Sequence, residues 1–130
     1  MLNKVTKVML VDDNEIDLKI NAKLINLFKL FDEIIICQSA EEALDYLNKY
    51  SSQSEKLPNL ILLDIQMPDM DGFDFLEEYK NLNKALTDKC TIAMLSSTLD
   101  FGDIKRAEAN PFVSTLLKKP LSIAELTALI

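Results

Sequence analysis

The chain contains no histidine among its 130 residues. This absence excludes histidine as a general acid or base, as a metal ligand, and as a donor of a phosphoryl group from this chain. Cysteine is also scarce: only Cys37 and Cys90 are present and no Cys-x-x-Cys motif occurs, so thiol redox chemistry has no support. Each cysteine borders an apolar run that predicts a strand, and we expect both to be buried thiols.

Basic residues and long apolar runs are few as well. Lysine and arginine total 14 against 21 aspartates and glutamates, which gives a formal net charge of −7. A surface of this sign repels nucleic-acid phosphates, so we expect no direct nucleic-acid binding and look instead to cations and protein partners. The longest apolar runs, such as 60–63 and 34–37, are too short to cross a bilayer, and no signal-peptide stretch follows Met1. We therefore expect a cytoplasmic protein that does not associate with membranes.

Short apolar runs alternate with longer segments in which apolar residues recur at helical spacing. Because the strands are nearly continuous in apolar residues, we expect an α/β fold with a parallel sheet covered on both faces, in one domain spanning 1–130. The strands are expected at 7–11, 34–37, 59–63, 91–95 and 112–117, and five helices at 15–29, after residue 39, from about 73, at 102–109 and from 122 onward.

Two helix starts have recognisable caps. Asn14 precedes the first helix, and Ser39 with Glu42 three residues later forms a capping-box pattern at the second. The first helix is predicted from apolar positions that recur at its spacing: Ile16, Ile20, Leu24, Leu27 and Phe28.

Polar side chains follow four of the predicted strands. Asp12 and Asp13 end the first strand, Asp64 the third, Ser96 the fourth, and a lysine before Pro120 the fifth. In open parallel sheets, ligands bind at the carboxyl ends of the strands, so these groups should meet in one cleft. Clustered carboxylates raise one another's pKa unless a cation lies among them, and oxygen ligands of this kind favour Mg²⁺.

This set of groups is suited to phosphoryl chemistry. A carboxylate beside Mg²⁺ can attack a phosphoryl group to form an acyl phosphate, while a metal, an ammonium and a hydroxyl stabilise the charged oxygens. Each residue alone has an ordinary explanation as a turn, cap or loop residue. Their common position at successive strand ends favours the functional interpretation.

From about residue 7 to its end, the chain resembles the receiver domains of bacterial response regulators. The resemblance rests on Val-Asp-Asp-Asn at 11–14, Leu-Leu-Asp-Ile-Gln-Met-Pro-Asp-Met-Asp-Gly at 62–72, Ser-Ser at 96–97 and Lys-Lys-Pro at 118–120. It implies a flavodoxin-like, doubly wound sheet of strand order 2-1-3-4-5 with five helices. It also implies a protein that is not an enzyme in the usual sense, because it catalyses only its own phosphorylation and dephosphorylation.

The resemblance assigns a role to each site residue. Asp64 would be the phosphoacceptor and Ser96 the switch hydroxyl, and Lys119 would pair with the phosphoryl group. Mg²⁺ would be held by Asp12, Asp13, Asp64 and the backbone carbonyl of Gln66. Lys118 is the rival lysine, but adjacent residues of a strand point to opposite sides and the family lysine directly precedes proline.

The implied partners are a histidine kinase or histidine phosphotransfer protein as donor and a downstream protein as target. A homodimer through the fourth helix and fifth strand stays open. Gln66 and Thr98 are expected to tune dephosphorylation. Two positions depart from the family: Leu116 replaces the usual aromatic residue of the fifth strand, which leaves the aromatic readout in doubt, and Asn110-Pro111 replaces a Gly-Ala pair.

Three other interpretations are compatible with parts of the sequence. A Mg²⁺-dependent aspartyl-phosphate phosphohydrolase would need a second acid–base aspartate, for which Asp69 and Asp71 are available, but the chain has no insertion long enough to enclose a substrate. A receiver-like interaction module without phosphorylation would not require the full set of site residues. A flavodoxin-like cofactor binder would place a phosphate against Asp12 and Asp13, which would repel it.

Overall fold

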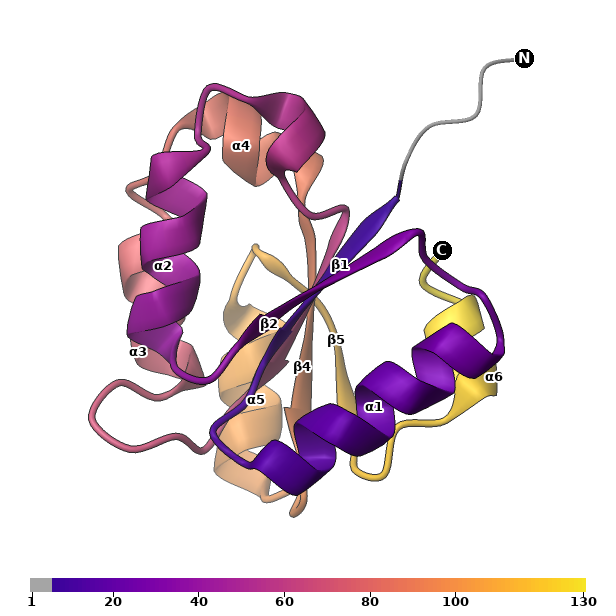
Figure 1. The fold of residues 1–130 in the computed structure, drawn as a ribbon. Coiled ribbons are helices and arrows are strands. Elements are labelled where there is room, and N and C mark those ends of the chain that lie inside the picture. Colours follow the sequence, from indigo (N-terminus) through magenta and orange to yellow (C-terminus); the bar gives the residue numbers. More distant parts are fainter. Residues whose placement is uncertain (1–5) are drawn as a thin grey trace.

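Five parallel strands alternate with helices along the chain in the computed structural model, which describes residues 6–130 (Figure 1). The sheet has the order β2-β1-β3-β4-β5, as the resemblance implies. The strands are β1 (Lys7–Val11), β2 (Glu33–Cys37), β3 (Leu60–Asp64), β4 (Thr91–Ser96) and β5 (Val113–Lys118). The helices are α1 (Glu15–Leu27), α2 (Ala40–Lys49), the 3-10 helix η1 (Ser54–Lys56), α3 (Gly72–Tyr79), α4 (Lys84–Lys89), α5 (Phe101–Ala109) and α6 (Ile123–Thr127).

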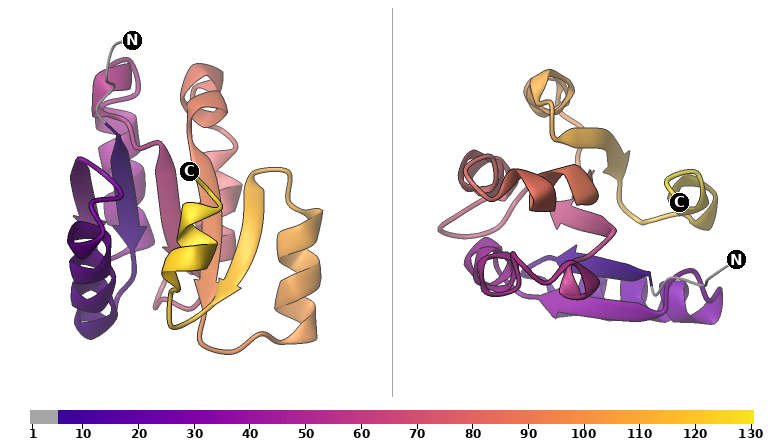
Figure 2. Two further views of the ribbon diagram at one scale, coloured as in Figure 1. Left: turned by 90° about the vertical axis from the view of Figure 1, so that its right-hand side faces the viewer. Right: turned by 90° about the horizontal axis from the view of Figure 1, so that it is seen from above.

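Helices cover both faces of the sheet, which confirms the doubly wound α/β arrangement (Figures 1 and 2). Successive residues of β1 enter different cores: Met9 and Val11 pack with α2, α3 and α5, whereas Val8 and Leu10 pack with α1 and α6. All five residues of β1 and of β3 are buried. Burying a side chain such as Leu10 stabilises the fold by about 1.5–3 kcal/mol, so the two central strands anchor everything attached to their ends.

The expected caps are present at the starts of α1 and α2. The side chain of Asn14 accepts hydrogen bonds from the backbone N–H groups of Ile16 (2.9 Å) and Asp17 (3.1 Å). The hydroxyl of Ser39 accepts from the N–H of Glu42 at 3.0 Å. The carboxylate of Glu42 accepts from the N–H of Gln38 (3.4 Å), one residue before the position that a capping box requires. The cap at Ser39 is therefore confirmed in one of its two bonds.

The described residues contain one α-helix more than the five expected. Helix α4 has only six residues, too few for helical periodicity to be recognised from the sequence. Asn83 caps it by accepting from the N–H of Ala85 at 2.9 Å, and Leu86 is its one fully buried residue. The chain thus makes one helical turn between α3 and β4 where a loop was expected.

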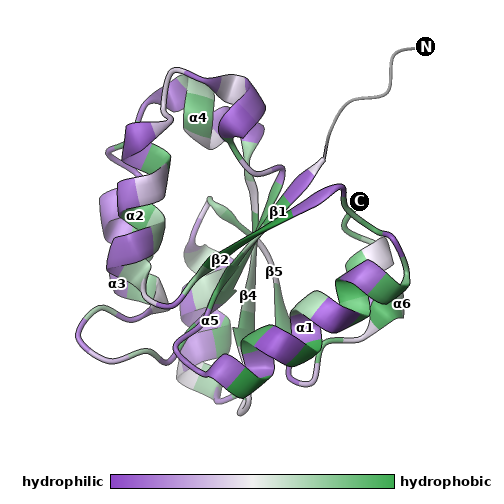
Figure 3. Cartoon of the chain, viewed as in Figure 1, coloured by the Kyte–Doolittle hydropathy of each residue, from purple (hydrophilic) through white to green (hydrophobic). Residues whose placement is uncertain are grey.

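Helix α1 buries a different face from the one that its large apolar residues suggest. Its buried residues are Leu18, Asn21 and Ile25. Ile16 is 68% exposed and Leu27 is 72% exposed. Figure 3 shows hydrophobic residues along this helix as well as through the strands. The outer face of α1 therefore exposes large apolar residues among charged ones such as Lys19 and Lys23.

Both thiols are in surroundings that keep them protonated. Burial raises the pKa of Cys37 to about 12 and that of Cys90 to about 11, and both are free cysteines. Cys37 is buried and Cys90 is partly buried, so the expectation of two buried thiols holds fully only for Cys37. Within residues 6–130 no helix combines the length and the apolar character needed to cross a membrane.

Candidate functional site at the strand ends

A cleft of about 380 Å³ opens at the carboxyl ends of β1 and β3. The parallel register pairs Val11 with Leu63 and Asp64 with Leu95, so neighbouring strands end at the same edge of the sheet. In the sheet, β2 lies on one side of β1 and β3 on the other. The strand order therefore reverses between β1 and β3, and ligands of such sheets bind at the carboxyl ends of these two strands. The cleft is lined by Asp12, Asp13, Asn14, Asp17, Asp64, Gln66, Ser97 and Lys119.

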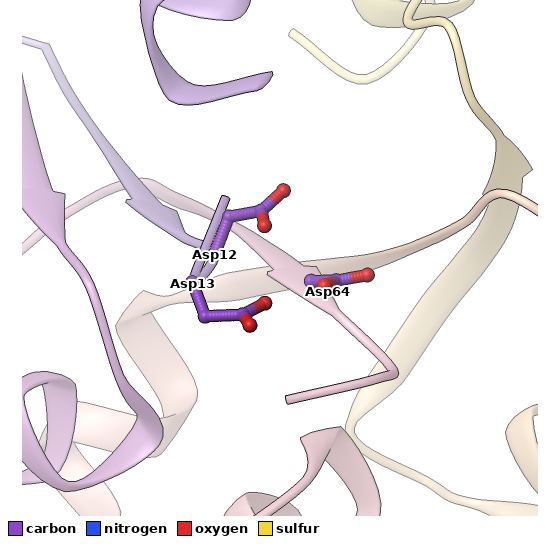
Figure 4. A group of neighbouring side chains, drawn as sticks. All are labelled: Asp12, Asp13 and Asp64. Carbon is purple, nitrogen blue, oxygen red and sulfur yellow. The ribbon is translucent and has the colours of Figure 1, made fainter. Parts of the chain in front are cut away.

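Three aspartates form an acidic cluster in this cleft (Figure 4). Asp12 and Asp13 follow β1, Asp64 is the last residue of β3, and one oxygen of each lies within 4.8 Å of the others. Asp12 and Asp64 are buried, at 3% and 5% exposure, whereas Asp13 is exposed. Carboxylate oxygens this close together fit a single hard cation such as Mg²⁺, with the exposed side left for water or a ligand.

Lys119 is the cation of the cleft. Its Nζ lies 2.8 Å from Asp12, 2.9 Å from Asp17 and 3.4 Å from Asp64. Burial by itself would lower the pKa of Lys119, but the hydrogen bonds to Asp12 and Asp17 outweigh it and raise that pKa above its usual value. The ammonium therefore stays charged. Lys118 is exposed, in keeping with the alternation of neighbouring residues along β5.

Asp64 has an unusual pKa for a carboxylic acid. Burial and the nearby charge of Asp12 raise it to about 6, although Lys119 and a hydrogen bond from the backbone N–H of Gln66 oppose the shift. A buried carboxylate beside a second one is costly without further positive charge. A bound cation would therefore lower the electrostatic cost of keeping these carboxylates ionised in the cleft.

The loop after Asp64 returns close to the strand that it leaves. The N–H of Gly72 donates to the carbonyl of Ile65 at 2.8 Å. A Cβ at position 72 would lie 2.7 Å from the backbone oxygen of Asp64 and 2.9 Å from the side chain of Met94. Only glycine fits this approach, which explains why the 62–72 motif ends in glycine.

Ser96 and Lys119 are connected through the backbone. The N–H of Lys119 donates to the carbonyl of Ser96 at 2.8 Å. The Ser96 hydroxyl is buried, donates to the carbonyl of Thr98 and accepts from the N–H of Thr98 at 3.2 Å. Ser97, and not Ser96, lines the cleft. The predicted switch hydroxyl therefore lies behind the cleft, bonded to its own loop.

Three lining residues were not singled out from the sequence as site residues: Asn14, Asp17 and Ser97. Asn14 and Ser97 belong to the 11–14 and 96–97 motifs, although neither was given a role in the cleft. Asp17 follows Asp12-Asp13 within the first turn of α1, which is the signal that could have identified it. Asp69 and Asp71, the acid–base candidates of the phosphohydrolase interpretation, do not line the cleft. Asp71 caps α3 by accepting from the N–H of Asp74 at 2.8 Å.

The two positions that depart from the family lie away from the acidic cluster. Leu116 lines a separate groove of about 460 Å³ between α5 and β5. Asn110 accepts from the N–H of Phe112 at 2.9 Å, so its side chain shapes the turn before β5 in place of the small Gly-Ala pair.

Comparisons with known proteins agree with the fold. The family model described as "Response regulator receiver domain" matches residues 8–130. A response regulator receiver protein from Dyadobacter fermentans DSM 18053 superposes with a TM-score of 0.87 at 37% identity, covering 96% of this chain and 94% of that chain. A two component response regulator from Cytophaga hutchinsonii gives a TM-score of 0.90 at 30% identity, covering 98% and 95%.

The chain belongs to the response regulator receiver domain family, and it is a receiver domain of the kind used in two-component signal transduction. A curated relative, the probable methanogenesis regulatory protein FilR2 of Methanothrix harundinacea (strain 6Ac), is 29% identical over 92% of this chain and 75% of its own length. The chain spans only 7% and 9% of two histidine kinases that it also matches, from Dictyostelium discoideum and Saccharomyces cerevisiae. A receiver domain is thus found both in short regulators and within much longer kinases.

Proposed function

We propose that Asp64 is the phosphoacceptor of this receiver domain and that a partner phosphohistidine is the phosphoryl donor. The observation that supports this most strongly is the position of the buried Asp64 carboxylate, which shares one cleft with two other aspartates and the ammonium of Lys119. The phosphohistidine would lie outside these 130 residues, in a histidine kinase or histidine phosphotransfer protein, because they contain no histidine.

Asp64 would attack the phosphorus atom with a carboxylate oxygen, in line with the bond that breaks. A P–O bond forms while the P–N bond of the phosphohistidine breaks, and the electron pair of that bond returns to the imidazole. The ring leaves as neutral histidine once it carries one proton. The product is an aspartyl phosphate, and no oxidant or reductant is required.

Mg²⁺ fits the donor set of the cleft. Asp12, Asp13 and Asp64, with the backbone carbonyl of Gln66, would hold it, and their oxygen atoms are the ligands that this ion prefers. The bound ion would offset the charge of the carboxylates and of the incoming phosphoryl oxygens. Lys119 would supply the remaining positive charge at the phosphoryl group.

Phosphorylation would change the contacts of Ser96. Its hydroxyl is bonded to Thr98, and it must give up this bond to reach a phosphoryl oxygen on Asp64. That movement would shift the β4–α5 loop and the groove of Leu99, Ile104 and Leu116, which we assign to a downstream protein target. Gln66 lines the cleft and Thr98 is the hydrogen-bond partner of Ser96, and both would tune hydrolysis of the acyl phosphate.

The phosphohistidine donor would dock on the outer face of α1. Ile16 and Ile20 are exposed there, and Asn14 and Asp17 of the same segment line the cleft. An apolar face beside the acceptor would bring a partner helix close enough for transfer. A donor of this kind would act in the cytoplasm, which is where we propose that the protein works.

The deciding experiment is intact-mass analysis after incubation with acetyl phosphate, with and without Mg²⁺, on the wild type and Asp64→Asn. We expect a single phosphoryl addition that requires both Mg²⁺ and Asp64. If the wild type gains no phosphoryl group from acetyl phosphate or from a phosphohistidine protein, the chain is an interaction module without phosphorylation. Rapid release of many phosphates per molecule would instead identify a phosphohydrolase.

A further inference from the structure

The ammonium group of Lys119 forms ion pairs with three carboxylates, and one of these, Asp17, lies outside the acidic cluster. Asp17, in the first turn of α1, accepts a hydrogen bond from Nζ at 2.9 Å, nearly as short as the 2.8 Å bond to Asp12. The distance from Nζ to Asp64 is 3.4 Å, the longest of the three. The side chain of Lys119 is only 14% exposed, whereas that of Asp17 is 34% exposed.

We propose that Asp17 is a positioning residue that restrains Lys119 away from Asp64 until a phosphoryl group arrives. This inference rests on the proposed function of Asp64 as phosphoacceptor. The carboxylate of Asp17 acts through Lys119, since it contacts the ammonium and is not one of the three clustered aspartates. It sets the balance between the resting and the phosphorylated arrangement of the cleft.

Asp17 differs from the other partners of Lys119 because it would neither bind the metal nor carry the phosphoryl group. When the site is loaded, Asp12 holds the metal and Asp64 carries the phosphoryl group. Asp17 alone remains free to compete with the phosphoryl oxygens for the ammonium. Its place is set by the α1 cap, because its backbone N–H donates to the side chain of Asn14 at 3.1 Å.

The negative charge of Asp17, like its hydrogen bond to Lys119, opposes the phosphorylated arrangement of the cleft. The cleft holds four carboxylates against one ammonium among its lining residues, and a phosphoryl group adds further negative charge. A neutral side chain at position 17 would both release Lys119 and reduce the repulsion of an incoming anion. Both effects favour the phosphorylated arrangement.

The test compares Asp17→Asn with the wild type at saturating Mg²⁺. Beryllofluoride, an analogue of the phosphoryl group, would be titrated and its binding followed by calorimetry and by the fluorine resonance of the bound ion. We expect Asp17→Asn to bind it about threefold to tenfold more tightly, the range expected for losing one partly exposed charge-assisted hydrogen bond. Phosphorylation by acetyl phosphate should accelerate by a similar factor.

Glu15→Gln is the matched control, because it removes one negative charge from the same turn of α1 at an exposed residue that does not line the cleft. It should change beryllofluoride affinity by less than about twofold. A second comparison places Asp17→Asn in a Lys119→Met background. There the gain should shrink to the part that comes from reduced repulsion, because the restrained ammonium is gone.

Unchanged or weaker beryllofluoride binding by Asp17→Asn would overturn the role of Asp17, as would a full gain that persists without Lys119. A role confined to folding would lower the melting temperature and leave the affinity ratio near one. Failure of the proposed function is distinguishable: the wild type itself would then bind no beryllofluoride and accept no phosphoryl group.

Discussion

Asp64 and Asp12 are two buried carboxylates at adjacent strand ends, and their closeness controls the acid–base behaviour of the cleft. Lys119 compensates one negative charge and shares itself with Asp17 as well. Burial, together with the charge of Asp12, still raises the pKa of Asp64. At the scale of single residues, the site is a strained electrostatic arrangement that a divalent cation would relieve.

The first prediction concerns Asp64→Asn and pH, measured without divalent cations. The pKa of Asp64 is raised from 3.8 to about 6 in the folded chain, so the folded state binds more protons than the unfolded state between these values. Stability contributed by the protonated carboxyl is therefore lost as pH rises from about 4 to about 6. Relative to Asp64→Asn, the wild type should lose on the order of 1–2 kcal/mol of unfolding free energy across this window.

Urea unfolding of both proteins in chelator at pH 4, 5, 6 and 7 measures this difference. The control is Asp88→Asn, which makes the same substitution at an exposed aspartate paired with Lys84. A wild type that gains stability relative to Asp64→Asn as pH rises would show that the pKa of Asp64 is depressed instead.

The elements that surround the cleft are connected by short, well-bonded segments. Helix α1 begins two residues after the acidic pair with a double Asn14 cap, and α3 begins at Gly72 with a capping box between Asp71 and Asp74. These helix starts hold the loops that carry the site residues. Changes at the loop–helix junctions should therefore affect the site more than changes in the outer turns.

The second prediction compares the two glycines. Gly72→Ala places a Cβ at 2.7 Å from the backbone oxygen of Asp64, and a backbone atom has little freedom to move. We expect a loss of about 1–3 kcal/mol together with weaker metal binding, since the strand end must shift. Gly102 lies within α5, and the nearest atom to a Cβ added there is a side-chain oxygen of Asp100 at 3.4 Å.

Gly102→Ala should therefore be neutral or stabilising by up to about 1 kcal/mol, because alanine favours helix over glycine. Thermal unfolding of both variants, with calorimetric titration of Mg²⁺, separates the two cases. Equal effects of the two substitutions would contradict the close approach at Gly72.

The third prediction concerns the outer face of α1. Ile16→Ser with Ile20→Ser removes exposed apolar area, so stability should change by less than about 0.5 kcal/mol per site. Transfer from a phosphohistidine protein should slow by tenfold or more, well beyond any change in the rate with acetyl phosphate. Phe101→Ser, at 64% exposure on α5, is the matched control for a lost exposed apolar residue. Equal slowing by both variants would place the docking surface elsewhere.

At the scale of the whole molecule, an acidic chain concentrates three carboxylates at one edge of a sheet whose two faces are closed by helices. The two hydrophobic cores stabilise the scaffold, and the cleft contributes charge repulsion that opposes it. A ligand that binds only the folded cleft should stabilise the entire domain.

The fourth prediction follows for Mg²⁺. The melting temperature should rise with Mg²⁺ concentration at pH 7, with a gain in stability of about 2.7 kcal/mol at a hundred times the dissociation constant. The gain should shrink below pH 6, where protons compete for Asp64. Asp13→Asn should reduce the shift, whereas Asp69→Asn, outside the cleft, should retain it. A shift of equal size in all three proteins would indicate general ionic effects.

Much of the architecture follows from the sequence because strands buried on both faces are continuous apolar runs. Residues 8–11 and 60–63 are such runs, and their polar successors identify the strand ends. Helix α4 escaped prediction because one turn with a single buried leucine leaves no periodic signal. The face of α1 was equally hidden, since Ile16 and Ile20 share the helical spacing but point to solvent.

The sequence by itself determined which residues end the strands, and with them the acidic pair, Asp64 and the lysine before proline. These residues directly follow apolar runs in the chain, so the sequence alone shows where they stand. Only the tertiary structure decided which groups touch: Asp17 bonds Lys119 across 102 positions of sequence, and Ser96 turns to Thr98 instead of the cleft. Such contacts depend on how helix α1 and strand β5 meet in space, and spacing along the chain does not encode that meeting.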